Sequence, residues 1–291
     1  MLTALQLKAL LQAQGLRLTK RLGQHHLIDP RVIAKIVETC EPLDGATVVE
    51  IGPGLGALTE RLAGRARRVV AVEVDRGIAA LLGLRLRALA HVEVRCEDIL
   101  QFSWEPFRHA LVVGAIPYHI TSPILASLFD ARGSIDRAVL VIQEEVAQRL
   151  AARPGTKAYG RLSVLVQYGW EVALRLGVPR GAFFPPPAVE SRCVELRSRP
   201  RPAVAVASEP VFFEVVKAAF SQRRKTLANA LANLPEGRRL PRAELQALLA
   251  SAGLPGSVRG ETLSLETFAA LANALAFRYQ IPSPRSLPKE R

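Results

Sequence analysis

The chain has 291 residues, a hydrophobic content of 49% and a formal net charge of +13. The length predicts one large domain or two smaller ones, and the hydrophobic content excludes a chain that is disordered throughout. No run approaches the ~20 apolar residues of a membrane helix, and three distant cysteines without a CxxC pair argue against a disulfide framework or a zinc site. The N-terminus has no secretory leader pattern, so we expect a cytoplasmic protein with no membrane partner.

In chain order, residues 1–28 predict a helix followed by a basic loop at 17–23. A second helix should start at Asp29 and Pro30, a capping residue followed by proline in the first turn. Short β-branched runs then predict strands at residues 47–51, 69–74, 92–95, 111–113 and 138–142, with helical periodicity between most of them, as at 58–63 and 77–86. Runs at 162–166 and 172–178 predict further strands after a helix near 144–152. This alternation is typical of a parallel sheet covered on both faces.

A change of composition near residues 197–208 predicts a domain boundary. Helical patterns at 211–220, 226–233, 242–252 and 265–277 follow it. We therefore expect an α/β domain with an N-terminal helical extension over residues 1–200 and a small all-helical domain, contacting RNA or substrate, over 208–280. The tail at 281–291 carries three prolines and several charges, and we expect it to be disordered.

A glycine-rich turn follows the first predicted strand and precedes a helix. Gly52, Gly54 and Gly56 are spaced as GxGxG after the acidic Glu50. Glycine lets the backbone pass close to a ligand, and the helix amides can meet an anion such as the carboxylate of a methionine moiety. A nicotinamide dinucleotide site would place the third glycine one position later. The spacing therefore favours S-adenosylmethionine, the alternative being a tight turn without a ligand.

Two acidic residues follow the next predicted strands. Glu73 lies 21 positions after Gly52, near the ~20 expected for a carboxylate that accepts ribose hydroxyls. Asp98 follows the third strand and could accept from an adenine exocyclic amine. The alternatives are a solvated acid at the strand end for Glu73 and a helix cap for Asp98.

Four segments carry a family resemblance. The segment after the fourth predicted strand reads Gly114-Ala115-Ile116-Pro117-Tyr118-His119-Ile120; the others are KRLGQHHL at 20–27, the proline-rich stretch at 178–191 and FSQRRKTLAN at 220–229. Together, in order over roughly residues 5–278, they make the chain resemble the ribosomal RNA adenine N6-dimethyltransferase family, whose small-subunit members confer kasugamycin sensitivity.

The resemblance implies a Rossmann-like methyltransferase domain that binds S-adenosylmethionine. It implies cofactor contacts from His25, Leu27, Gly52, Glu73, Asp98 and Ala115, alongside Gly54 and Gly56 of the turn. It also implies a catalytic segment of Ala115, Ile116, Pro117 and Tyr118, with a flipped adenine stacked on Tyr118 and bordered by Phe183. An enzyme acting on a base must take that base out of the stack, and an aromatic face compensates the loss.

Ala115 departs from the family, which carries Asn, or sometimes Asp or Ser, there. The adenine amine is a poor nucleophile, and two acceptors can hold its hydrogens in the geometry needed to attack a sulfonium methyl. A methyl group accepts no hydrogen bond, so Ala115 leaves the Ile116 carbonyl to serve alone. An engineered knockout, a homologue with reduced activity and an enzyme in which another group, such as His119, substitutes all remain open.

His26 is a second departure, because the family usually carries Phe at that position. Adjacent histidines without a third ligand do not make a metal site, so we expect no metal.

The charge favours a polyanionic partner, the alternative being a generally basic surface. The expected RNA contacts are Arg17, Lys20, Arg21, Arg223, Arg224 and Lys225, with Arg65, Arg67 and Arg68 as a further cluster. The expected partner is small-subunit rRNA in an assembling 30S-type particle, bound by a monomer.

The expected reaction is N6-dimethylation of two adjacent adenosines in the 3′-terminal hairpin loop of 16S rRNA. The alternatives are an impaired assembly factor that keeps cofactor and RNA binding, a macrolide-resistance enzyme acting on large-subunit RNA, and, with less support, a DNA adenine methyltransferase.

Overall fold

The computed structural model describes residues 3–16, 24–222, 224–235 and 239–279. The loop predicted at 17–23 and the tail predicted at 281–291 lie outside these residues. The chain divides into two compact units, Met1–Gln148 with Glu171–Ser198, and Arg149–Trp170 with Arg199–Arg291. The composition placed one boundary near residues 197–208 and did not separate 149–170, so the predicted domain limits stay a prediction.

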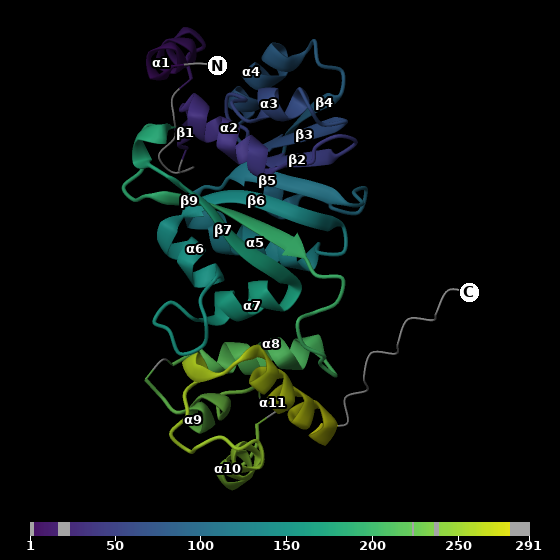
Figure 1. Cartoon of the computed structure of the whole chain (residues 1–291), viewed down its shortest axis with the longest axis vertical. Coiled ribbons are helices and arrows are strands. Elements are labelled where there is room, and N and C mark those ends of the chain that lie inside the picture. The colour runs from purple at the N-terminus through teal and green to yellow at the C-terminus, as the bar shows by residue number, and fades with distance from the viewer. Residues whose placement is uncertain (1–2, 17–23, 223, 236–238, 280–291) are drawn as a thin grey trace, which may run out of the picture. The chain divides into compact units, whose positions relative to one another are not determined.

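A seven-stranded sheet forms the centre of the first unit (Figure 1). Its strand order is β4-β3-β2-β5-β6-β9-β7. The strands are β2 (Thr47–Ile51), β3 (Arg68–Glu73), β4 (Val92–Cys96), β5 (Ala110–Ala115), β6 (Ile135–Gln143), β7 (Trp170–Val178) and β9 (Ser191–Ser198). Strands β2 to β6 pair in parallel, whereas β9 pairs antiparallel with β6. The five predicted strands from 47 to 142 are confirmed, and so is the strand at 172–178.

Both faces of the parallel part of the sheet are covered. Successive residues of one strand point to opposite faces of the sheet, and here the residues on each face are buried. Val48 and Val49 of β2 are each inaccessible to solvent, and so are Val112 and Val113 of β5. The helices that follow β1, β2 and β3 are α2 (Pro30–Thr39), α3 (Thr59–Ala63) and α4 (Arg76–Leu86), and their apolar residues pack on one face. Helix α5 (Thr121–Asp130) follows β5 and buries Ile124, Leu125 and Leu128.

Helix α2 starts where the sequence predicted. The Asp29 carboxylate accepts hydrogen bonds from the amides of Arg31 at 2.8 Å and Val32 at 3.2 Å, and Pro30 occupies the first turn. This cap satisfies two amides that the helix itself leaves unpaired.

Two sequence-based predictions were wrong. Residues 162–166 do not form a strand but lie in helix α7 (Arg161–Gly169), because a short apolar run looks the same in a strand and a buried helix. Strand β9 was not predicted, because its charged residues resemble a linker. Its Glu195 is nevertheless buried, and it is paired with Arg175 and Arg197. The sheet is consequently mixed rather than parallel throughout.

A small second sheet lies beside the main one. Strand β1 (His26–Leu27) pairs antiparallel with β8 (Phe183–Phe184), which follows the short turn η4 (Arg180–Ala182). Helix α1 (Ala4–Ala13) buries Leu7 and Leu11 in a cluster with Leu55 of the glycine turn, and Phe184 packs against the same cluster. Segments from both ends of the first unit are thereby brought to the carboxyl edge of the strands.

Helices dominate the second unit. They are α8 (Glu209–Ala219), α9 (Leu227–Leu231), α10 (Arg242–Ser251) and α11 (Leu265–Arg278), together with α7 and the turn η6 (Gly260–Thr262), whereas α6 (Glu144–Leu150) spans the division between the units. The four C-terminal helices were predicted. Phe220 and Phe268 pack at a centroid distance of 5.8 Å in their core. Among the described residues, no helix combines the length and apolarity needed to cross a bilayer.

Candidate cofactor and acceptor site

The glycine turn after β2 is shaped by positive backbone angles. Gly54 has φ +55°, and a Cβ there would lie 2.4 Å from Nδ1 of His26. At Gly56, with φ +87°, a Cβ would lie 2.6 Å from a methyl of Leu82 on α4. Both positions therefore require glycine, for backbone conformation and for space.

Glu73 joins this turn to the neighbouring strand. Its Oε2 accepts from the Gly54 amide at 3.1 Å and its Oε1 from the Asp75 amide at 3.0 Å. Burial raises the pKa of Glu73, while these amide hydrogen bonds favour its charged form. Each oxygen keeps a second lone pair, so the carboxylate can still accept from a ligand.

Asp98 caps a short turn and lines a cavity, and its predicted contact with an adenine amine stays a prediction. Its Oδ1 accepts from the Leu100 amide at 2.9 Å and caps the short turn η2 (Ile99–Gln101). Asp98 also lines the same cavity as Glu73. A cap residue at the carboxyl end of β4 thus also presents an acceptor to the cavity.

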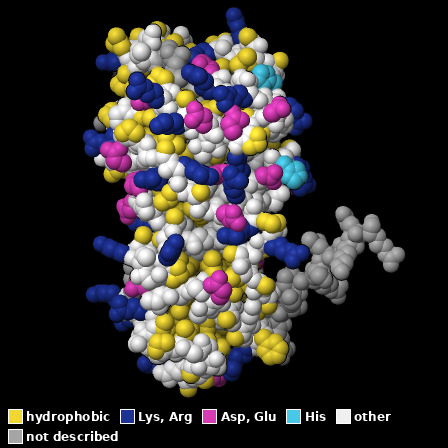
Figure 2. Space-filling view, in the orientation of Figure 1, with side chains coloured by type: hydrophobic (Ala, Val, Ile, Leu, Met, Phe, Trp, Pro, Cys, Tyr) yellow, Lys and Arg dark blue, Asp and Glu magenta, His cyan; other side chains and the backbone are white. Residues whose placement is uncertain are grey.

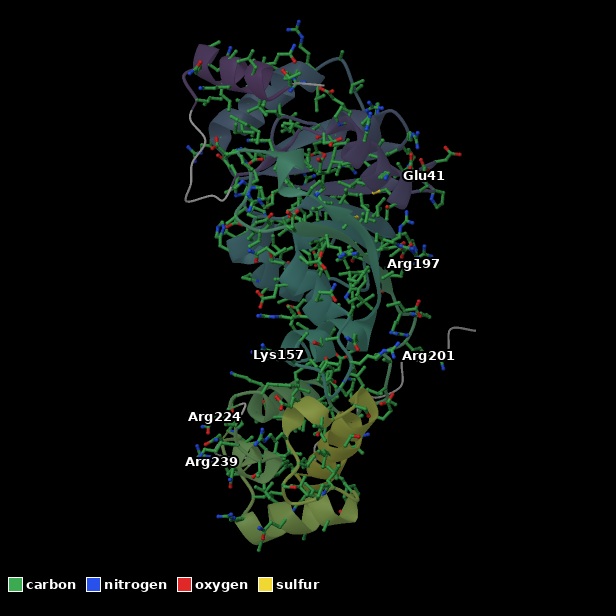
Figure 3. The ribbon with its side chains drawn as sticks, turned by 60° about the vertical axis from the view of Figure 1, so that its left-hand side comes forward. Glu41, Lys157, Arg197, Arg201, Arg224 and Arg239 are labelled. Atoms are coloured by element: carbon green, nitrogen blue, oxygen red, sulfur yellow. The ribbon has the colours of Figure 1, made fainter. Side chains whose placement is uncertain are left out.

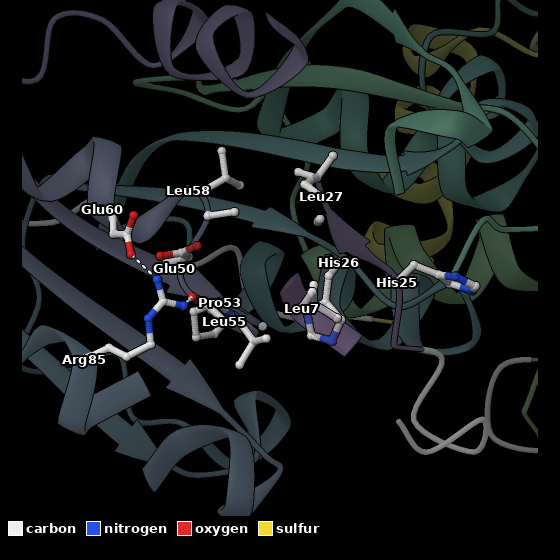
Figure 4. A pocket seen from close by; sticks show the side chains of 13 residues that line it. Leu7, His25, His26, Leu27, Glu50, Pro53, Leu55, Leu58, Glu60 and Arg85 are labelled. Carbon is white, nitrogen blue, oxygen red and sulfur yellow. Dashed lines mark hydrogen bonds and ion pairs between the residues drawn. The ribbon is translucent and has the colours of Figure 1, made fainter. Parts of the chain in front are cut away.

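Two adjoining cavities lie at the carboxyl edge of the strands, and His25, His26, Gly52 and Ala115 line both. The first, shown in Figure 4, is also lined by Leu7, Leu27, Glu50, Pro53, Leu55, Ala57, Leu58, Glu60 and Arg85. The second is also lined by Gln24, Ile51, Gly54, Val72, Glu73, Val74, Glu97, Asp98, Ile99, Pro117 and Ile120. Of the residues predicted to contact the cofactor, Gly56 lines neither cavity. The structure brings the others together, and their contacts with a ligand stay a prediction.

Glu50 is a site residue to which the sequence reasoning assigned no role. It is 1% exposed, its Oε2 has no hydrogen-bond partner among the described residues, and it lines the first cavity. Burial raises its pKa to about 8. The signal available in the sequence was the acidic residue directly before the turn. A buried carboxylate with an unpaired oxygen is stabilised by a cationic partner. The α-ammonium of a methionine moiety has that chemistry, so these residues fit S-adenosylmethionine.

The segment after β5 borders both cavities. Ala115 is the last residue of β5, and the amide of buried Ile116 donates to the Val141 carbonyl at 2.9 Å. Within the described part of the chain, the Ile116 carbonyl forms no hydrogen bond. Pro117 lines the second cavity. The predicted acceptor segment and the glycine turn therefore meet at one place.

Tyr118 begins the turn η3 (Tyr118–Ile120). Its hydroxyl lies 2.7 Å from Oγ of Ser191, and its ring stacks on that of His25 at a centroid distance of 5.8 Å. His119 is exposed and lines neither cavity, so nothing in its position supports the idea that it replaces the missing Asn.

Phe183 lies in the core. It is 4% exposed, pairs with Leu27 across β1 and β8, and lines neither cavity. Its predicted role at the border of the base stays a prediction.

The two histidines have different environments. Nδ1 of His25 lies 2.7 Å from the Pro185 carbonyl; because a carbonyl only accepts, Nδ1 carries the hydrogen. Burial, together with the charge of His25, lowers the pKa of His26 to about 4. Among the described residues, no group of three His, Cys, Asp or Glu side chains could hold a metal ion.

The predicted RNA contacts are only partly described. Arg17, Lys20, Arg21 and Arg223 lie outside the described residues. Arg224 and Lys225 are exposed in the second unit just before α9, where Figure 3 shows Arg224 and Arg239 projecting from the same side. Their contacts with RNA stay predictions.

The role of Arg65, Arg67 and Arg68 in a phosphate-binding path stays a prediction. Arg68 begins β3, at the edge of the sheet opposite to Glu73. Arg65 pairs with Glu41, and Arg68 pairs with Glu93 at 2.7 Å. Figure 2 shows basic side chains of the first unit interspersed with acidic ones.

Comparison with known proteins agrees with the geometry. The fold and the cavity at the carboxyl edge are those of a Rossmann-like methyltransferase. The chain belongs to the ribosomal RNA adenine dimethylase family, whose profile matches residues 15–276. It is 43% identical to ribosomal RNA small subunit methyltransferase A of Bacillus mycoides and of Bacillus cereus, over 92% of this chain and 94% of each relative.

Two solved structures share most of the fold. A dimethyladenosine transferase from Plasmodium falciparum superposes with a TM-score of 0.77 at 24% identity, covering 89% of this chain and 100% of that one. The 23S rRNA methyltransferase ErmE superposes with a TM-score of 0.67 at 32% identity, covering 86% and 98%.

Proposed function

We propose that this protein transfers methyl groups from S-adenosylmethionine to N6 of two adjacent adenosines in the 3′-terminal hairpin loop of small-subunit rRNA. The observation that carries this proposal is the meeting of the Glu73 and Asp98 cavity with the segment from Ala115 to Tyr118. The 43% identity to small-subunit methyltransferases favours that RNA over large-subunit RNA. The cytoplasmic location, the single-chain state and the 30S-type partner are parts of this proposal.

In this proposal the donor is held along the edge of the sheet. Glu73 accepts from the ribose hydroxyls, Asp98 from the adenine amine, and Glu50 faces the α-ammonium in the first cavity. When bound, the cofactor supplies a methyl group on a positively charged sulfur. Its contacts are distributed over β2, β3 and β4, so the relative position of these strands determines where the methyl group lies.

The acceptor base stacks on Tyr118, and the Ile116 carbonyl accepts one hydrogen of its amine. The S-adenosylmethionine that Glu73, Asp98 and Glu50 would hold would supply the methyl group to the amine nitrogen, which would release its proton to solvent. No strong base is needed, because the nitrogen releases the proton only once it is cationic. The protein contributes mainly position and electrostatics.

Ala115 favours a second candidate, an assembly factor that binds cofactor and RNA but transfers methyl slowly. Ala115 lines both cavities yet offers no acceptor side chain. Loss of one preorganised hydrogen-bonding group typically costs about 100- to 1,000-fold in rate. The two candidates differ in turnover and share their binding partners.

Methyl transfer to isolated subunits tests the proposal. The protein is incubated with methyl-labelled S-adenosylmethionine and unmethylated small subunits, with large subunits in parallel. We expect label in N6,N6-dimethyladenosine of the 3′-terminal hairpin and none in large subunits. Label on large subunits would contradict the substrate. Tight binding of cofactor and small subunits without label would favour the assembly factor, and absence of cofactor binding would overturn both candidates.

A further inference from the structure

Two side chains from distant segments hold the ring of Tyr118. Its hydroxyl lies 2.7 Å from Oγ of Ser191, and the plane of His25 lies 26° from that of its ring. His25 is itself held by the Pro185 carbonyl at 2.7 Å. Tyr118 begins a turn of only three residues. Groups outside its own segment therefore set the plane of the ring.

The position of Ser191 is determined by the main sheet. It is the first residue of β9, pairs in register with Gln143 at the end of β6, and is 1% exposed. A buried hydroxyl needs a hydrogen-bond partner, and Tyr118 provides it. The phenol is therefore anchored to a buried residue of the main sheet.

The plane of a stacking ring determines what it can do for a base. Stacking depends on near-parallel, offset rings, and a free tyrosine side chain rotates about two bonds. The bond to Ser191 restrains that rotation at the far end of the ring. His25 stacks on one face of the ring, so a base would stack on the other.

We propose that Ser191 is a positioning residue for methyl transfer, whose hydroxyl holds Tyr118 in the plane on which the acceptor base stacks. This inference rests on the proposed function, because the stacked group is the acceptor adenine. Ser191 lines neither cavity, so it acts through Tyr118. A small buried side chain on β9 thereby contributes to the geometry of the reaction.

The test compares Ser191→Ala, Tyr118→Phe and the double variant. Each single change removes one end of the same hydrogen bond, so we expect each to lower kcat/KM for RNA by about 3- to 10-fold. Because the two groups act as one unit, the double variant should lose no more than Tyr118→Phe alone. Binding of S-adenosylmethionine, measured by calorimetry, should not change.

A fluorescent acceptor separates positioning from general stability. The hairpin RNA carries 2-aminopurine in place of an acceptor adenosine, and stacking on Tyr118 quenches its emission. Bound RNA should be brighter with Ser191→Ala than with the original protein at saturating concentration. Ser198→Ala is the matched control, because Ser198 ends the same strand and bonds to the Arg132 carbonyl at 3.3 Å. That variant should leave emission and kcat/KM unchanged.

The outcomes distinguish this inference from the proposed function. Unchanged emission and kcat/KM in Ser191→Ala would overturn the role of Ser191 and leave the proposed function intact. Losses that multiply in the double variant would do the same. An original protein that neither methylates the hairpin nor alters the emission of 2-aminopurine would overturn the proposed function and, with it, this inference. Thermal melting checks that each variant is folded.

Discussion

The main-chain amide of Gly54 donates a 3.1 Å hydrogen bond to Oε2 of Glu73, which ties the turn after β2 to the acid that ends β3. The strand before the turn, β2, pairs in parallel with β3. One carboxylate therefore shapes the turn and presents an acceptor to the cavity.

Glu73→Gln should weaken binding of S-adenosylmethionine by about 10- to 100-fold, since hydrogen bonds to a charged group contribute roughly 1.5–3 kcal/mol. An amide has only one accepting oxygen, so it cannot satisfy both the Gly54 and the Asp75 amides. Calorimetry measures the change. Glu93→Gln is the control, because Glu93 pairs with Arg68 away from the cavity and should bind normally. Equal affinity in the two variants would refute the role of Glu73.

Ala115→Asn should raise kcat on small subunits, by up to about 100-fold, because it restores a second acceptor for the adenine amine. Ala115→Leu has similar bulk and no acceptor, and should give no gain. Labelled methyl transfer measures both rates, and cofactor affinity measured alongside excludes a binding effect. If the Asn variant is no faster than the original protein, another group already fills this role.

Glu50 should make folding stability fall with rising pH. Its pKa is raised to about 8 in the folded chain, from an ordinary 4.5. Between these values the unfolded chain has lost the proton that the folded chain keeps, so the free energy of unfolding decreases as pH rises. The slope is at most about 1.4 kcal/mol per pH unit. Urea denaturation from pH 5 to 8 should show a shallower decline for Glu50→Gln.

The same residue predicts proton release on binding. At neutral pH the Glu50 carboxyl is mostly protonated in the folded chain, and an incoming ammonium favours the ionised form. Calorimetry in buffers of different ionisation enthalpy should detect protons released when S-adenosylmethionine binds. Glu50→Gln should abolish that release, and its persistence would assign it to another group.

Replacing Arg223, Arg224 and Lys225 together with Ala should weaken RNA binding and reduce its salt dependence. Each phosphate contact contributes roughly 0.7–0.9 to the slope of log K against log salt, so the slope should fall by about two. The matched control replaces Arg65, Arg67 and Arg68 with Ala. It removes the same charge from the first unit, where Arg65 is paired with Glu41 and Arg68 with Glu93. Equal slopes for both variants would indicate a nonspecific charge effect.

Local patterns were sufficient for much of the fold. The five strands from 47 to 142, the capped start of α2 and the C-terminal helices were predicted because each depends on neighbouring residues: periodicity, a cap or a turn. The run at 162–166 was misassigned because a short apolar run has no distinguishing period. Strand β9 was missed because its charged Glu195 is buried, paired with Arg175 of β7, Arg137 of β6 and Arg197 of its own strand.

For the site, the residues with the right chemistry could be recognised before the structure was known. The glycine spacing, the acids after successive strands and the Ala115 to Tyr118 segment could all be found along the chain, because each follows a strand whose carboxyl end lies at one edge of a parallel sheet. Which of these residues lie together depends on the folding of distant segments. It paired Tyr118 with Ser191, 73 positions away, left Oε2 of buried Glu50 without a hydrogen bond among the described residues, and placed Phe183 in the core. These relationships depend on side chains brought together by long-range packing, which leaves no local pattern to read.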